Sequence, residues 1–128
     1  MIIEDGCMLL MHNTRDPYLY TVGGGVMIGE TSEEAVVREV LEETGAKYAV
    51  DRLVMVCEDM WSDDDGTPGH QLDFVYLMAS KGTREGIRES TFNGTVTEYP
   101  VWVPLDAIST SDICPKHICD MDWDDTDG

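Results

Sequence analysis

The stretch GGGVMIGETSEEAVVREVLEETG, residues 23–45, decides how this chain folds around its candidate site. It opens with three consecutive glycines, where the backbone can adopt a positive φ or approach another group closely. The residues that follow predict a helix over 31–44. Thr31 and Glu34 fit a capping box at its start, and Gly45 is a natural C-terminal stop.

The two sides of the predicted helix differ in character. At about 100° per residue, aliphatic side chains form one stripe, and Glu39, Glu42 and Glu43 cluster on roughly the opposite side. The stripe that we expect to be buried consists of Val36, Val37, Val40 and Leu41. Three carboxylates at i, i+3 and i+4 repel one another, and a hard divalent cation relieves that repulsion. A solvated acidic helix face is the alternative interpretation of such a cluster taken alone.

Fixed spacings connect the glycines to the helix. In order they are Gly24, five residues, Glu30, seven residues, Arg38-Glu39-Val40, one residue, Glu42-Glu43, one residue and Gly45. This pattern resembles the signature of the Nudix hydrolase family, specifically over 23–45 and only architecturally elsewhere. The resemblance implies an α/β fold, an αβα sandwich around a mixed sheet. It also implies a loop-helix-loop site that binds Mg²⁺ or Mn²⁺.

The same resemblance assigns roles to individual residues. It implies metal ligands at Glu39, Glu42 and Glu43, with the carbonyl of Gly23 or Gly24 as a further ligand, and it makes Glu42 and Glu43 catalytic. Arg38 and Glu30 would orient these groups. A later glutamate often completes the site in this family, and our candidate is Glu98, with Glu89 and Glu85 behind it.

The implied activity is hydrolysis of a nucleoside diphosphate linked to another moiety, by attack of a metal-activated water. Two alternatives remain open: a pyrophosphatase that sanitises oxidised nucleoside triphosphates, and a Nudix-fold module that senses nucleotides without turnover. For substrate contacts we select Arg15, because positive charge is scarce in this chain, and Trp61 and Tyr18, whose rings can stack on a base.

Composition limits the class of protein. A chain of 128 residues suits a single domain, 1–128, in which the aspartate-rich segment 120–128 is expected to be a frayed tail. The formal net charge of −18 disfavours nucleic-acid polymers and anionic membranes as partners, and it requires cations beside any phosphate substrate. With no apolar run of membrane-spanning length and no secretory signal, we expect a cytoplasmic protein.

The remaining pattern predicts mostly strands. We expect a hairpin from Ile2-Ile3 and 7–11, a strand over 18–22, two long strands over 48–57 and 72–79 in a central sheet, and a last strand over 101–103 before a helical turn at 105–108. Residues 58–70 and 81–97 are expected to be loops. Elements of the family fold that lack counterparts in this sequence suggest a homodimer, in which a partner subunit supplies them.

The four cysteines, at positions 7, 57, 114 and 119, are expected to be free thiols, as in a reducing compartment. We do not expect zinc at Cys114, His117 and Cys119, because the sequence offers no second ligand pair with the spacing of a zinc site.

Overall fold

The computed structural model describes residues 1–88, 90–92 and 96–123. Its main sheet has the strand order β6-β7-β2-β3-β8, with β1 paired to β2 as well. All pairings are antiparallel except that of β3 with β8, so the sheet is mixed. The strands are β1 (Ile2–Glu4), β2 (Cys7–Asn13), β3 (Leu19–Thr21), β6 (Ser90–Phe92), β7 (Val96–Pro104) and β8 (Ile113–Cys114).

Strand β2 is the centre of the fold because both of its faces are buried. Met8 and Leu10 join one core cluster and Leu9 and Met11 the other, and all four side chains have 0% exposure. Successive side chains of a strand point to opposite faces, so this continuous apolar run suits a strand covered on both sides. The predicted hairpin of β1 and β2 is confirmed.

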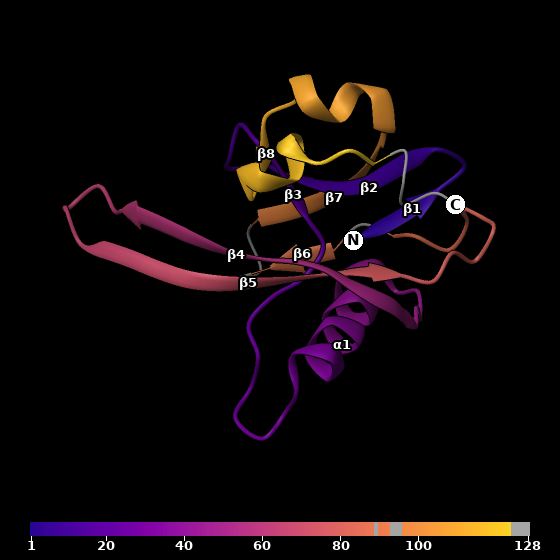
Figure 1. Ribbon diagram of the computed structural model, residues 1–128, viewed down its shortest axis with the longest axis horizontal. Helices are drawn as coiled ribbons and strands as arrows, with labels where there is room; N and C mark the ends of the chain where they lie inside the picture. Colours follow the sequence, from indigo (N-terminus) through magenta and orange to yellow (C-terminus); the bar gives the residue numbers. More distant parts are fainter. Residues whose placement is uncertain (89, 93–95, 124–128) are drawn as a thin grey trace.

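Different kinds of helix cover the two faces of the main sheet. On one side lies α1 (Ser32–Thr44), and on the other lie two 3₁₀ helices, η1 (Leu105–Thr110) and η2 (Lys116–Asp120) (Figure 1). The expected α/β fold with a mixed sheet is confirmed, and its second helical cover is of the 3₁₀ type. The helical turn predicted at 105–108 is the first part of η1.

The caps of α1 agree with the prediction. The side chain of Thr31 accepts from the backbone N–H of Glu34, the Glu34 side chain reaches back to the Thr31 backbone, and Gly45 adopts a left-handed conformation at φ 76°. The predicted buried stripe is wrong at one position. Val40 is fully buried, but Leu41 is 45% exposed, because the buried line of the helix runs through Ala35, Val40 and Thr44.

The longest strands form a separate ribbon, and this corrects two predictions. Among the described strands, β4 (Val50–Ser62) and β5 (Pro68–Met78) pair with each other alone, and they project from the body (Figure 1). They are therefore not central strands of the sheet, and most of the expected loop 58–70 is strand. Cross-strand hydrogen bonding carries the pairing out to Ser62 and Pro68, where only a tight turn with Gly66 at φ 84° remains.

Glu4 of β1 holds the base of this ribbon, where β4 begins and β5 ends. Its carboxylate is 1% exposed and accepts from the Tyr48 hydroxyl, which precedes β4, and from the Ser80 hydroxyl and the backbone of Lys81 and Gly82, which follow β5. Four donors around one carboxylate offset the cost of burying it. The base of the ribbon is thereby fixed to the body.

Two further predictions concern less regular segments. The expected loop 81–97 contains β6 and the start of β7, which are held in the sheet by pairing with each other. The expected frayed tail, 120–128, is described only as far as Trp123. Trp123 is packed in the core at 3% exposure, with its indole N–H donating to the Ile118 carbonyl at 2.8 Å. Up to this residue the chain is therefore not frayed.

Candidate functional site

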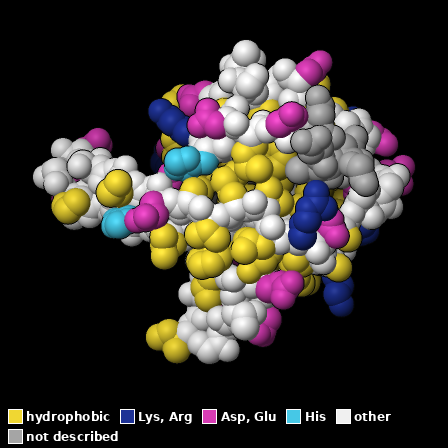
Figure 2. All heavy atoms as spheres, in the orientation of Figure 1, with side chains coloured by type: hydrophobic (Ala, Val, Ile, Leu, Met, Phe, Trp, Pro, Cys, Tyr) yellow, Lys and Arg dark blue, Asp and Glu magenta, His cyan; other side chains and the backbone are white. Residues whose placement is uncertain are grey.

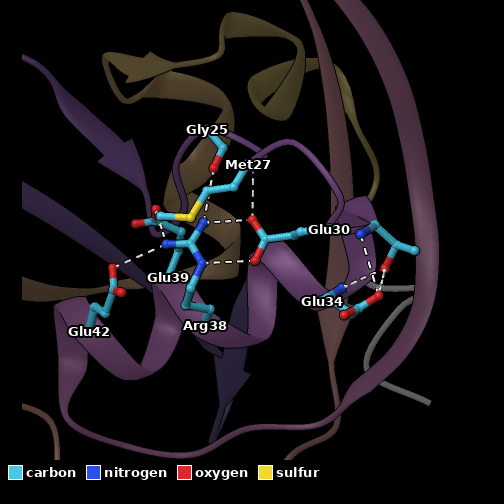
Figure 3. Close-up of polar contacts among 8 residues, drawn as sticks. Gly25, Met27, Glu30, Glu34, Arg38, Glu39 and Glu42 are labelled. Atoms are coloured by element: carbon cyan, nitrogen blue, oxygen red, sulfur yellow. Dashed lines mark hydrogen bonds and ion pairs between the residues drawn. The ribbon is translucent and has the colours of Figure 1, made fainter.

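A single arginine, Arg38 of α1, contacts both the glycine loop and the carboxylates of the helix. Arg38 binds both carboxylate oxygens of Glu30, through Nε at 2.9 Å and Nη2 at 2.8 Å, and its Nη2 also donates to the Gly25 carbonyl at 3.1 Å. Its Nη1 donates to Glu39 at 2.8 Å and to Glu42 at 3.3 Å (Figure 3). The guanidinium lowers the pKa of Glu30 to about 2. Arg38 therefore ties the glycine loop to the carboxylates of α1.

The glycine loop approaches the helix so closely that a side chain at Gly24 would displace the Glu39 carboxylate. A Cβ at this position would lie 2.5 Å from the carboxyl carbon of Glu39 and 2.7 Å from each of its oxygens. This close approach is a physical reason for a glycine at the first position of the spacing pattern. It also holds the Glu39 carboxylate between the loop and Arg38.

Glu43 is the most perturbed acid of the helix. Its Oε2 accepts from the backbone N–H of Gly23 at 2.9 Å. Burial raises the pKa of Glu43 to about 8, and the carboxylates of Glu98, Glu39 and Glu42 act in the same direction against the hydrogen bond from Gly23. A raised pKa in a group of like charges marks a place where positive charge is missing.

Glu98 reaches this group from another part of the fold. It lies on β7 directly opposite Asn13 of β2, it is 5% exposed, and it accepts a hydrogen bond from the Tyr20 hydroxyl. Asn13 Nδ2 also donates to that hydroxyl at 3.3 Å. The sequence did not predict that Asn13 and Tyr20 contact Glu98, because only strand pairing brings the three residues together. The catalytic role of Glu98 stays a prediction. Of the other two glutamates considered, Glu85 is exposed and Glu89 lies outside the described residues.

The donor set of α1 suits a hard divalent cation in its chemistry, since it offers only carboxylate oxygens and carries excess negative charge. Glu39, Glu42 and Glu43 are the residues that could hold the ion. Within the described residues their ligand atoms do not form a group with mutual separations under 4.8 Å; such a group exists at Cys57, Asp59 and Asp73. At Gly23 the contact with Glu43 is made by the N–H and not by the carbonyl.

A cavity of about 480 Å³ lies beside the glycine loop. It extends from residues 22–26 and the start of α1 to β5, and its far wall includes Asp59, Asp73 and Cys114. None of the α1 glutamates lines it. The glycine loop thus borders the cavity and also contacts the carboxylate group, since Gly23 and Gly24 lie against Glu43 and Glu39.

The three predicted substrate contacts are not brought together. Arg15 is exposed and pairs with its neighbour Asp16 at 3.1 Å. Tyr18 packs edge-on against Tyr20, with ring centroids 6.5 Å apart, and so lies one ring away from Glu98. Trp61 was expected in a loop; it is part of β4, opposite Gly69 near the tip of the ribbon, and it does not line the cavity.

Comparisons with known proteins agree with this architecture. The chain is 38% identical over 82 residues to an ADP-ribose pyrophosphatase from Methanocaldococcus jannaschii, a match that covers 61% of this chain and 46% of that protein. The chain therefore spans about half the length of this curated relative.

Solved structures are also similar. A MutT NUDIX hydrolase from Burkholderia pseudomallei is 30% identical with a TM-score of 0.57, and the match covers 82% of this chain and 78% of that one. The ORF135 protein of E. coli has a TM-score of 0.61 at 20% identity, over 92% and 79% of the two chains, and so shows likeness of fold alone. The family model described as NUDIX domain matches residues 1–119. Because that match spans most of the sequence, this chain belongs to the Nudix family.

Proposed function

We propose that this chain is a metal-dependent pyrophosphohydrolase that cleaves a nucleoside diphosphate linked to another moiety. The observation that carries the proposal is the state of Glu43, a half-buried carboxylate that accepts a hydrogen bond from the Gly23 amide. Burial and three nearby carboxylates raise the pKa of Glu43 to about 8. Such a group is costly to keep unless a bound cation compensates it. The state of Glu43 therefore supports binding of Mg²⁺ or Mn²⁺ by Glu39, Glu42 and Glu43.

When bound, Mg²⁺ or Mn²⁺ supplies neutralising charge for the phosphates and lowers the pKa of a water molecule. The chain's own residues would do the rest. Arg38 cannot act as a base, because its pKa is raised further by Glu30 and Glu39; it keeps Glu39 and Glu42 in place. Glu98, oriented by Tyr20, completes the group and is our candidate to accept the proton of the attacking water.

The substrate proposal is a nucleotide-type small molecule, with ADP-ribose as the first compound to test. It is supported by the similarity to the ADP-ribose pyrophosphatase of Methanocaldococcus jannaschii. The cavity beside the glycine loop, about 480 Å³, has a size suited to such a ligand. Hydrolysis of ADP-ribose adds water across the P–O–P bond and releases AMP and ribose 5-phosphate in equal amounts.

The test is turnover of ADP-ribose in Mg²⁺ or Mn²⁺, measured by chromatography of both products, with EDTA as control. We expect equimolar AMP and ribose 5-phosphate, and no turnover in EDTA. A panel that adds an oxidised purine nucleoside triphosphate distinguishes the sanitising alternative, which predicts preference for that compound. Tight binding of nucleotides without cleavage of any of them would establish the sensing module and overturn the proposal.

We further propose a homodimer located in the cytoplasm. The outward face of the ribbon supports association, since Val56, Met60, Leu72 and Phe74 are between 46% and 75% exposed there. Figure 2 shows hydrophobic side chains along the ribbon and acidic ones over the surrounding surface. Light scattering should give twice the 14.3 kDa chain mass, and Leu72→Glu should return it to the single mass.

No helix in the described residues is long and apolar enough to cross a membrane.

A further inference from the structure

A second group of metal-ligating side chains lies on the ribbon, outside the carboxylates of α1. Cys57 of β4 and Asp73 of β5 are directly opposed in the strand register, and Asp59 follows two residues after Cys57 on the same face. One ligand atom from each of the three lies within 4.8 Å of the others. All three residues are partly buried, because this face of the ribbon turns toward the body.

Asp73 has an acceptor atom that lacks a donor. Its Oδ1 accepts from Gln71 Nε2 at 2.6 Å, whereas its Oδ2 is buried and has no hydrogen-bond partner in the described part of the chain. Burial, together with the adjacent Asp59 carboxylate, raises the pKa of Asp73 to about 6. Two carboxylates that face each other in a partly buried place need either a shared proton or a cation between them.

The surroundings supply an entry path and further donors. Asp59 and Asp73 line the wall of the cavity beside the glycine loop, so an ion can reach them from solvent. His117 of η2 is the nearby nitrogen donor, with Nε2 3.9 Å from Oδ1 of Asp59. The zinc arrangement rejected from the sequence, Cys114 with His117 and Cys119, lacked further ligands. The ribbon brings a thiol and two carboxylates to this side of the molecule.

We propose that Cys57, Asp59 and Asp73 bind one borderline transition-metal cation of the Zn²⁺ class, with His117 as the nearest donor for the fourth position. A thiolate in the ligand set selects Zn²⁺ over Mg²⁺, which prefers oxygen alone. Ligands of a tetrahedral zinc site lie roughly 3.5 Å apart, which small side-chain rotations achieve from separations below 4.8 Å. The cation satisfies Asp73 Oδ2 and displaces the thiol proton of Cys57 to solvent.

The experiment uses the full chain carrying Glu39→Gln, Glu42→Gln and Glu43→Gln, so that the proposed catalytic ligands do not contribute. Reduced protein is titrated with Co²⁺ and followed by absorption. We expect one Co²⁺ per chain and a thiolate-to-cobalt charge-transfer band in the near ultraviolet, which Zn²⁺ then removes by competition. If the two carboxylates share only a proton, no band appears and the proposal is overturned.

Matched variants assign the ligands. Cys57→Ser should abolish the band and weaken Zn²⁺ binding at least about a hundredfold, since losing outer partners alone costs about 10- to 100-fold. Asp73→Asn, which keeps the side-chain volume, should keep the band but weaken binding at least about tenfold. Cys7→Ser, on the main sheet, should change neither. A band that survives Cys57→Ser, or that only Cys114→Ser removes, would overturn the assignment; circular dichroism checks that each variant is folded.

Discussion

The loop and helix of residues 23–45 and the ribbon of residues 50–78 both gather carboxylates, but they do so in different ways. In the first region Arg38 contacts three glutamates, and local spacing alone brings them together. In the ribbon, Asp59 and Asp73 meet across two strands. Among the residues that the structure describes, neither makes an ion pair with a lysine or arginine.

This difference teaches how each group of charges is compensated. Around α1, much of the compensation comes from the chain itself, and Glu43 is the carboxylate left with a raised pKa. On the ribbon, the buried Asp73 Oδ2 has no such compensation. We therefore propose one place for an external cation in each region, beside Glu43 and beside Asp73.

The largest effect is expected at Glu43. Glu43→Gln keeps the size of the side chain but removes the charge, and we expect turnover to fall by about 10² to 10³ because a principal electrostatic group is lost. Steady-state rates with ADP-ribose and Mg²⁺ measure it. Glu33→Gln, an exposed change of the same type in the first turn of α1, should leave the rate within about twofold. A loss below tenfold at Glu43 would contradict the importance of this region.

Gly24→Ala tests whether close packing of the loop matters as much as charge. The added methyl group would lie 2.5 Å from the Glu39 carboxyl carbon, so the loop or the carboxylate must move. We expect turnover to drop by about tenfold to a hundredfold, as a displacement of about 1 Å near reacting groups can cause. Gly25→Ala meets no atom within 4 Å and should cost clearly less. Equal losses for the two variants would show that the contact with Glu39 is unimportant.

Glu4→Gln tests the attachment of the ribbon to the body. The change places an amide N–H₂ among four donors, and we expect the free energy of unfolding to fall by about 1 to 3 kcal/mol. The hydrogen bonds lower the pKa of Glu4 despite its burial. Its contribution is therefore present above the ordinary glutamate pKa and is lost as the pH falls through the lower folded value. Urea unfolding at several pH values should show less acid dependence in the variant.

The smallest effect should have the opposite sign. In EDTA, Asp73→Asn removes a charge that faces Asp59, and the amide can donate to that carboxylate. We expect the free energy of unfolding to rise by about 0.5 kcal/mol, a modest value because solvent screens this partly exposed pair. Asp64→Asn, in the exposed turn of the ribbon, is the matched control and should change little. A clear loss of stability for Asp73→Asn would show that the repulsion is already compensated within the chain.

Several features could be predicted because their causes lie within a few residues of one another. The capping box of Thr31 and Glu34 and the left-handed Gly45 are examples. The position of Leu41 was not predictable in this way, because the buried line of the helix depends on what packs against it. Trp61 was misplaced for a similar reason: pairing with a distant strand, and not its polar neighbours, keeps it in β4.

The sequence by itself determined the glycine loop, the capped helix and the order of Glu39, Glu42 and Glu43, since a helix brings residues three and four apart together whatever surrounds it. Only the tertiary structure decided that Glu98 meets Tyr20 and that Cys57 opposes Asp73. Strand pairing joins residues that are distant in the chain, and its register follows from burial of the whole sheet. No local spacing encodes such contacts.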